Sequence, residues 1–87
     1  MYKKEVKIIN EEGLHARPAS LFVKIANKYK SEIKIACKGN SGFAKSILNI
    51  MALGAHKDSV IEITAEGNDE VEAVEALIEF VAAGCGE

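Results

Sequence analysis

The chain has 87 residues, of which 48% are hydrophobic and 28% charged, and its formal net charge at pH 7 is −2. This length predicts one domain, residues 1–87, with one modest core and no cleft for a large substrate. The weakly acidic balance argues against nucleic-acid binding. The lack of a long apolar run argues against membrane insertion or a signal sequence, so we expect a cytoplasmic protein.

Cysteine and histidine usage argues against a disulfide framework or a metal centre. Cys37 and Cys85 are too few for such a framework, and their spacing from the two histidines fits no zinc motif. Cys37 is expected in the core and Cys85 near the end of the chain. We expect no metal and no other cofactor, since the sequence also has no glycine-rich nucleotide loop.

The first two predicted elements are a strand and a helix. Residues 2–9 alternate apolar with charged side chains and place Val6 and Ile8 on one face, which is typical of a half-buried strand. Residues 16–28 have helical spacing and predict an amphipathic helix that packs on a sheet. The apolar face of this helix is formed by Phe22, Ile25, Ala26 and Tyr29.

The start of that helix lies in the stretch GLHARPAS at residues 13–20. Pro18 supports this placement, because a fixed φ and a missing N–H are tolerated in the opening turn. His15 and Arg17 then lie where early backbone N–H groups, those of Ala16 and Arg17, attract anions. Neutral imidazole can attack phosphorus, and a guanidinium can hold phosphoryl oxygens. The stretch predicts a phosphate site with its own nucleophile.

A hairpin and a short helix follow. Residues 33–37 alternate with period two, the turn KGNSG occupies 38–42, and a short strand is expected around Phe43. Ser46 is expected to cap a helix of about two turns that ends at Gly54. One face of this helix can be shared by Ile47, Ile50 and Met51.

A strand and a helix complete the chain. Residues 59–66 alternate and predict a fourth strand. Its inward side chains are Ile61, Ile63 and Ala65. Asn68 is expected to cap a last helix that ends at Gly84 and carries acidic residues in its first turn. The buried face of this helix is expected to hold Val71, Val74, Leu77, Ile78 and Val81. The order βαββαβα predicts an α+β fold with helices on one face of a single sheet.

Two segments, GLHARPAS at 13–20 and KSILNIMALG at 45–54, resemble the histidine-containing phosphocarrier family HPr of the bacterial sugar phosphotransferase system. The resemblance covers essentially the whole chain. It implies an open-faced β-sandwich, in which a four-stranded antiparallel sheet carries three helices on one face. It also implies that His15 accepts a phosphoryl group, derived from phosphoenolpyruvate, from enzyme I and passes it to a sugar-specific enzyme IIA. The chain would then be a phosphoryl carrier and not an enzyme.

The basic residues also have plainer interpretations. A lone histidine at a helix start is more often a cap or a solvated side chain, but Arg17, Pro18 and the second matching segment favour phosphoryl acceptance by His15. His56 lies in a polar stretch and is expected to be a loop residue without a chemical task. A cluster of lysines forms either a solvated helix face, which we favour, or a surface that steers an acidic partner. The cluster consists of Lys24, Lys28 and Lys30.

Ser46 raises a second hypothesis. In family members from Gram-positive bacteria, an ATP-dependent kinase phosphorylates the matching serine, which slows the relay and creates a docking surface for a transcription regulator. The resemblance thus adds HPr kinase/phosphorylase and a catabolite-control regulator as partners. An alternative function is a regulatory binding module that acts mainly through Ser46. The plainer interpretation is an ordinary N-cap. Leu48 and Asn49 stand where those relatives usually have methionine and glycine, which weakens the expectation of recognition.

A partner surface is expected beside the histidine, on the first and second helices. It combines Ser20, Leu21, Lys24, Ile47, Leu48, Asn49 and Met51. Core packing is an open alternative for Ile47 and Met51 and is disfavoured for Leu48. Because one surface must serve successive partners, we expect small, transient interfaces and a monomeric chain.

Overall fold

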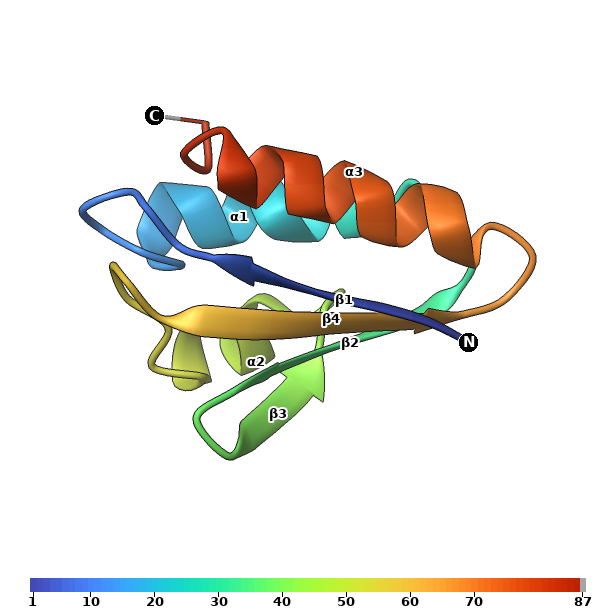
Figure 1. The fold of residues 1–87 in the computed structure, drawn as a ribbon, viewed down its shortest axis with the longest axis horizontal. Helices are drawn as coiled ribbons and strands as arrows, with labels where there is room; N and C mark the ends of the chain where they lie inside the picture. Colours follow the sequence, from blue (N-terminus) through green and yellow to red (C-terminus); the bar gives the residue numbers. More distant parts are fainter. Residues whose placement is uncertain (87) are drawn as a thin grey trace.

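Four strands and three helices follow one another in the order βαββαβα (Figure 1). The computed structural model describes residues 1–86. The strands are β1 (Tyr2–Lys7), β2 (Glu32–Cys37), β3 (Asn40–Phe43) and β4 (Val60–Glu66). The helices are α1 (Ala16–Ala26), α2 (Ile47–Ala52) and α3 (Glu70–Ala82). The predicted order of elements is confirmed.

The strands form one antiparallel sheet in the order β1-β4-β2-β3. Helix α3 packs on β1, β4 and β2, α1 lies against α3 and α2, and α2 reaches the edge strand β3 (Figure 1). The predicted α+β open-faced sandwich is therefore confirmed. Among the described residues, no helix is long and apolar enough to cross a membrane.

The core fills the space between the sheet and the helices. Of the strand side chains predicted to face inward, Val6 is half-buried and the others are buried: Ile8, Ile33, Ile35, Cys37, Ile61, Ile63 and Ala65. Phe22 of α1 meets Phe80 of α3 edge to face, with ring centroids 6.3 Å apart. Aromatic pairs prefer such a geometry, so this contact joins the two long helices. Cys85, which was expected only to lie near the chain end, is fully buried.

Several elements end earlier than the sequence predicts, and α2 and α3 end at Ala52 and Ala82, two residues before the predicted glycines. Strand β1 stops at Lys7 rather than residue 9, because the ladder becomes irregular there: the Ile8 carbonyl accepts from the Asp58 amide, while the Ser59 amide donates to the His56 carbonyl. Helix α1 stops at Ala26 rather than residue 28, because the Lys28 amide donates to the Ile25 carbonyl and tightens the last turn. On the predicted apolar face of α1, Phe22 and Ala26 are buried, whereas Ile25 and Tyr29 are half-buried.

Two expectations about α3 were wrong. Val71 is 46% exposed, because the buried stripe of α3 runs through other residues, and Ile78 at the stripe's margin is half-buried. The stripe consists of Ala73, Val74, Leu77 and Val81. Asn68 does not cap the helix, since Asp69 is the N-cap residue. Helical spacing allowed either stripe, and the packing on the sheet selected one of them.

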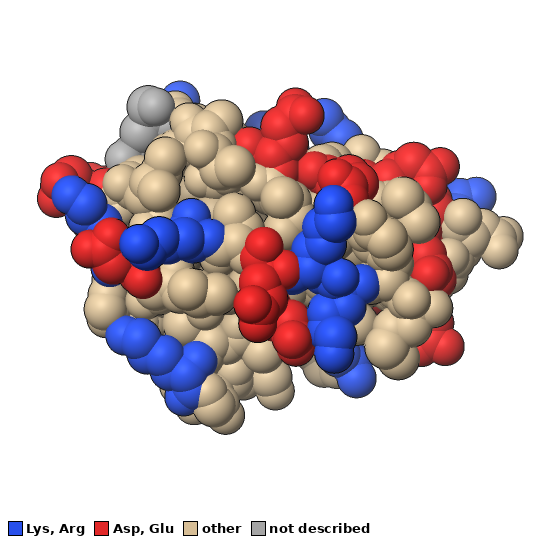
Figure 2. All heavy atoms as spheres, viewed as in Figure 1, with Lys and Arg blue, Asp and Glu red and all other residues tan. Residues whose placement is uncertain are grey.

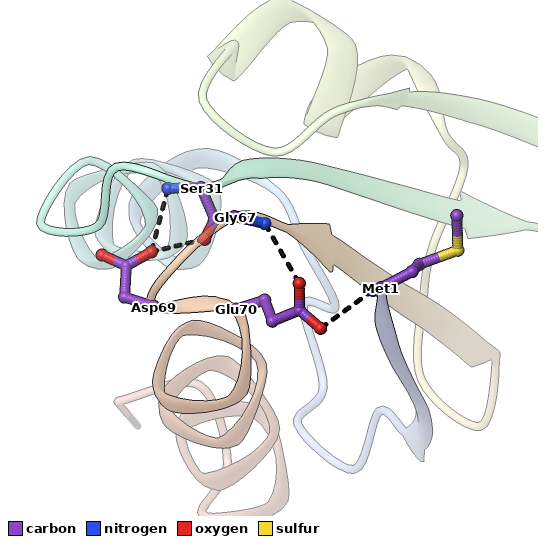
Figure 3. Close-up of polar contacts among 5 residues, drawn as sticks. All are labelled: Met1, Ser31, Gly67, Asp69 and Glu70. Carbon is purple, nitrogen blue, oxygen red and sulfur yellow. Dashed lines mark hydrogen bonds and ion pairs between the residues drawn. The ribbon is translucent and has the colours of Figure 1, made fainter.

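Acidic residues at the start of α3 join it to two other parts of the chain (Figure 3). The Asp69 carboxylate accepts hydrogen bonds from the Ser31 hydroxyl and from the amides of Ser31 and Lys30, both at 2.9 Å. The Ser31 hydroxyl, and then the Lys30 amide, lower the pKa of Asp69. Glu70 accepts from the Gly67 amide and pairs with the amino group of Met1 at 2.9 Å. These contacts fix the end of the sheet opposite the His15 loop.

The outer face of the sheet is charged in bands. The register places Glu5 opposite Glu62, whereas Lys3 and Lys34 both lie opposite Thr64 in the next row. Figure 2 shows such acidic and basic bands side by side over the strands. This face is therefore polar, as expected for a sheet with one side in solvent.

Candidate functional site

The loop that leads into α1 rests on the loop that leads into β4. A Cβ atom on Gly13 would lie 2.5 Å from the Ala55 carbonyl oxygen and 2.6 Å from the Cα of His56, and φ of Gly13 is +64°, so glycine is required. The amide of Leu14, a buried residue, donates to the same Ala55 carbonyl at 3.0 Å. The backbone immediately before His15 is therefore held in place.

Two side chains add to this connection. Asn10 is buried, and its Nδ2 donates to the Gly13 carbonyl at 3.0 Å. Lys57 pairs with Glu11 at 2.9 Å. The hydrogen bond between them lowers the pKa of the Glu11 carboxyl and raises the pKa of the Lys57 ammonium. Because this pair is exposed, its contribution is small, and Gly13, Leu14 and Asn10 provide most of the support.

His15 occupies the N-cap position of α1 but does not cap the helix with its side chain. Its backbone is extended, with φ −122° and ψ 154°, and the side chain makes no capping hydrogen bond. The imidazole is exposed. The alternative of a capping side chain is therefore wrong, and the imidazole is open to solvent and partners.

The first turn of α1 places a cation and main-chain donors next to this imidazole. Arg17 is exposed and forms no ion pair with any other residue of the described chain, 1–86. The amides of Ala16 and Arg17 belong to the first turn, where no helical carbonyl can accept from them. Pro18, the third helical residue, is buried, as an opening-turn proline can be. The site is thus open, positively charged and able to bind an anion.

Ala16 is strained at this position. Its φ is +49°, in the left-handed region that alanine rarely adopts, and it is exposed. Such a conformation costs about 1 kcal/mol or more, so the surrounding contacts must maintain it. Here the fixed backbone of Gly13 and Leu14 on one side and the buried Pro18 on the other hold the residue between them.

Helix α2 presents apolar side chains to solvent beside α1. The exposed fractions are 41% for Ile47, 76% for Leu48 and 39% for Met51, whereas Ile50 is fully buried. The core-packing alternative for Ile47 and Met51 is therefore wrong. Ser46 caps the helix, because its Oγ accepts from the Asn49 amide. Its side chain is half-buried.

The α1 part of the expected partner surface lies next to these residues. Ser20 and Lys24 are exposed and Leu21 is half-buried, and α1 contacts α2 directly. Asn49 differs from the others, because its side-chain oxygen accepts from the Phe43 amide of β3 at 2.9 Å. The two parts of the predicted surface thus lie on neighbouring helices, and one of its residues, Asn49, is turned toward the sheet.

The remaining polar features lie apart from this site. A hollow of about 390 Å³ lies between the C-terminal end of α1 and α3. Its lining includes Lys28, Tyr29, Glu79 and Phe80 but not His15. Lys28 itself is exposed, as are Lys24 and Lys30. Within residues 1–86, no three histidine, cysteine or acidic side chains gather closely enough to hold a metal ion.

His56 lies in the loop that supports Gly13, and its side chain is exposed. Its Nε2 lies 2.8 Å from Nζ of Lys38, and its Nδ1 lies 3.2 Å from the Lys57 carbonyl oxygen. Sequence reasoning placed His56 in a loop, which is confirmed, but missed the contact between this loop and Gly13. In the sequence, the glycine at position 13 was the local signal of that contact.

Comparisons with known proteins agree with this geometry. The family model described as the PTS HPr component phosphorylation site matches residues 2–83. The chain is 48% identical to the HPr-like protein Crh of Halalkalibacterium halodurans over 93% of this chain and 96% of that protein. It is 52% identical to phosphocarrier protein HPr of Buchnera aphidicola subsp. Schizaphis graminum over 88% of this chain and 91% of that protein.

A solved structure is also similar over the full length. The crystal structure of HPr-C-His from Thermoanaerobacter tengcongensis superposes with a TM-score of 0.96, at 42% identity, and the match covers 100% of this chain and 98% of the other. The chain therefore belongs to the HPr family, the phosphocarriers of the phosphotransferase system.

Proposed function

We propose that His15 is the phosphoryl acceptor of this chain, and that the chain takes the group from phosphorylated enzyme I and gives it to sugar-specific enzyme IIA components. The observation that carries this proposal is the exposed imidazole at the first turn of α1, which makes no capping bond and stands two residues from Arg17. Nucleophilic attack needs a ring nitrogen that a partner can reach.

In this transfer a ring nitrogen of His15 attacks phosphorus. A new P–N bond forms as the P–N bond to the donor histidine of enzyme I breaks, and the donor nitrogen keeps the electron pair of the broken bond. The amides of Ala16 and Arg17 and the positive end of α1 stabilise the negative oxygens of the bound phosphoryl group. The Arg17 guanidinium holds those oxygens during arrival and departure, because phosphoryl transfer depends mainly on positioning and charge stabilisation.

Both partners would use one surface made of α1 and α2. The exposed Ile47, Leu48 and Met51 supply apolar area, and Lys24 supplies a positive charge at the margin. A surface of this size suits a weak, short-lived complex, which a carrier needs if it is to be released after each transfer. The chain is thus a reactant in the relay and returns to its starting state only when the acceptor has taken the group.

The test is phosphorylation of the chain by enzyme I and phosphoenolpyruvate, followed by intact mass. We expect one acid-labile phosphate on the wild-type chain and none on His15→Ala, while the matched control His56→Ala keeps the label. Arg17→Ala should keep the label but receive it about 10- to 1000-fold more slowly, because the nucleophile stays and the charge clamp is lost. An unchanged mass of the wild-type chain, or a label on His15→Ala, would remove the proposal.

We also propose that Ser46 is a regulatory phosphorylation site, and the observation that favours it is the position of its hydroxyl at the N-cap of α2. Ser46 is half-buried at the start of α2, directly before the exposed Ile47 and Leu48, so a phosphate there would change the charge of the partner surface. Incubation with ATP and an HPr kinase should label the chain and not Ser46→Ala. A regulator that binds labelled and unlabelled chains equally would argue against this role.

A further inference from the structure

We propose that Asn49 is a positioning residue for partner recognition, because its side-chain carbonyl fixes α2 to the edge of the sheet. This inference rests on the proposed function, in which α2 contributes to the docking surface. The sequence indicated only that asparagine in place of glycine at this position weakens the expectation of recognition. The structure instead shows the side chain bonded to β3.

The contact on the sheet side is specific. Strand β3 is an edge strand, and the amide of Phe43 points away from β2 to Oδ1 of Asn49, at 2.9 Å. The next amide, that of Ala44, points back and donates to the Ile33 carbonyl at 2.9 Å. Asn49 therefore pairs an N–H group that the open edge would otherwise present to solvent or to another chain.

Gly42 makes room for this side chain. A Cβ atom on Gly42 would lie 2.8 Å from Cβ and 3.0 Å from Oδ1 of Asn49, which is too close for either to remain in place. Gly42 does not have a positive φ, so alanine is compatible with its backbone. Because the Cβ of Asn49 moves only with its backbone, a substitution at Gly42 would push α2 itself, together with the Asn49 carboxamide, away from β3.

On the helix side, α2 has few other attachments. The helix has six residues, and Ile50 is the only one of them that is buried. A helix this short is not stable in isolation, so its position depends on tertiary contacts. Asn49 makes one of these contacts, because its side chain accepts from the Phe43 amide, and its backbone amide also donates to the capping Ser46 Oγ at 3.2 Å.

The exposed docking residues lie on both sides of this attachment. Leu48 precedes Asn49 and Met51 follows it by two positions, so a rotation or shift of α2 would displace both. Loss of the Asn49 carbonyl should therefore weaken binding of a partner without altering the reaction at His15, which stands on α1. Pre-positioned contacts reduce the entropy that a partner must overcome on binding.

The experiment compares Asn49→Ala with Asn49→Asp, which retains an acceptor oxygen at the same place. Leu48→Ala serves as a control that removes a docking side chain and keeps the Phe43 contact. We expect amide exchange at Phe43 to accelerate about tenfold in Asn49→Ala and to stay near wild type in the other two variants. Transfer from enzyme I should show a KM for the carrier that is about three- to tenfold higher in Asn49→Ala, with kcat unchanged.

Gly42→Ala provides a second route if Asn49→Ala does not fold. It should also raise the KM, because it pushes α2 and the Asn49 carboxamide away from β3. An unchanged KM in a folded Asn49→Ala whose Phe43 amide exchanges faster would overturn this inference alone. A wild-type chain that enzyme I does not phosphorylate would overturn the proposed function as well.

Discussion

Backbone contacts, more than side-chain bonds, determine where His15 stands. Gly13 lies directly against the Ala55 carbonyl, and the next amide, that of Leu14, donates to the same oxygen. The chain then enters α1 through Ala16 in a left-handed conformation. The imidazole needs no bond of its own in this arrangement, so its ring nitrogens remain accessible for chemistry.

Substitution of Gly13 tests this support. Gly13→Ala should destabilise the fold by about 2 to 4 kcal/mol, since it combines a positive φ with a clash against the Ala55 backbone. Gly39→Ala is the matched control, because Gly39 has a φ of +85° and open space around it. The control should cost only about 1 kcal/mol. Urea denaturation of both variants measures the difference, and equal losses would show that the close approach contributes little.

The reactive residues could be predicted from the sequence because their signal is local. His15, Arg17 and Pro18 lie within four positions, and their chemical types suffice to indicate an anion site at a helix start. The strain at Ala16 could not be predicted, because it depends on a contact between Gly13 and a loop some forty positions away. Likewise, nothing near Asn49 in the sequence indicates that its side chain bonds to β3.

At the scale of elements, the junction between α1, β2 and α3 explains why the start of α3 was misplaced. Helical rules favoured Asn68 as the cap, but the cap position is taken by Asp69, whose carboxylate is bonded to Ser31 and Lys30. The bond spans 38 residues between Ser31 and Asp69. Periodicity located the strands well, since alternation reports burial on one face, whereas such a distant polar contact leaves no periodic signal.

The same junction predicts a dependence of stability on pH. Hydrogen bonds from Ser31, and then Lys30, lower the pKa of Asp69 from its ordinary value of 3.8. A carboxyl group with a lowered pKa stabilises the fold above its unfolded-state pKa, and this contribution disappears as the pH falls through the folded-state pKa. Asp69→Asn should therefore be less stable than wild type at about pH 7, and the difference should shrink toward zero near about pH 2. Denaturation at both pH values measures it, and a difference that grows on acidification would refute the assignment.

At the scale of the whole molecule, both open edges of the sheet are protected against pairing. Strand β1 carries charged side chains at four of its six positions, and β3 is four residues long with its Phe43 amide covered by α2. Charged side chains, a short edge strand and an edge amide covered by a helix all discourage edge-to-edge association. The outer face between these edges is banded with charge, which also opposes a stable apolar interface (Figure 2).

We therefore expect a monomer in solution. Sedimentation velocity at about 10 to 100 µM should give the mass of one chain, 9.4 kDa, at low and at moderate salt. Asn49→Ala uncovers the β3 edge and is the informative comparison, since any tendency to associate should increase in that variant. A wild-type dimer at these concentrations would show that an edge or a face is less well protected than its charges indicate.

The central claim, that the phosphoryl group is carried on His15, is tested most directly by phosphorus–proton correlation spectroscopy of the chain after reaction with enzyme I and phosphoenolpyruvate. The account predicts a single phosphoramidate signal coupled to the ring protons of His15, which disappears when enzyme IIA is added. A signal coupled to His56, or a phosphoester signal on a hydroxyl group, would contradict it.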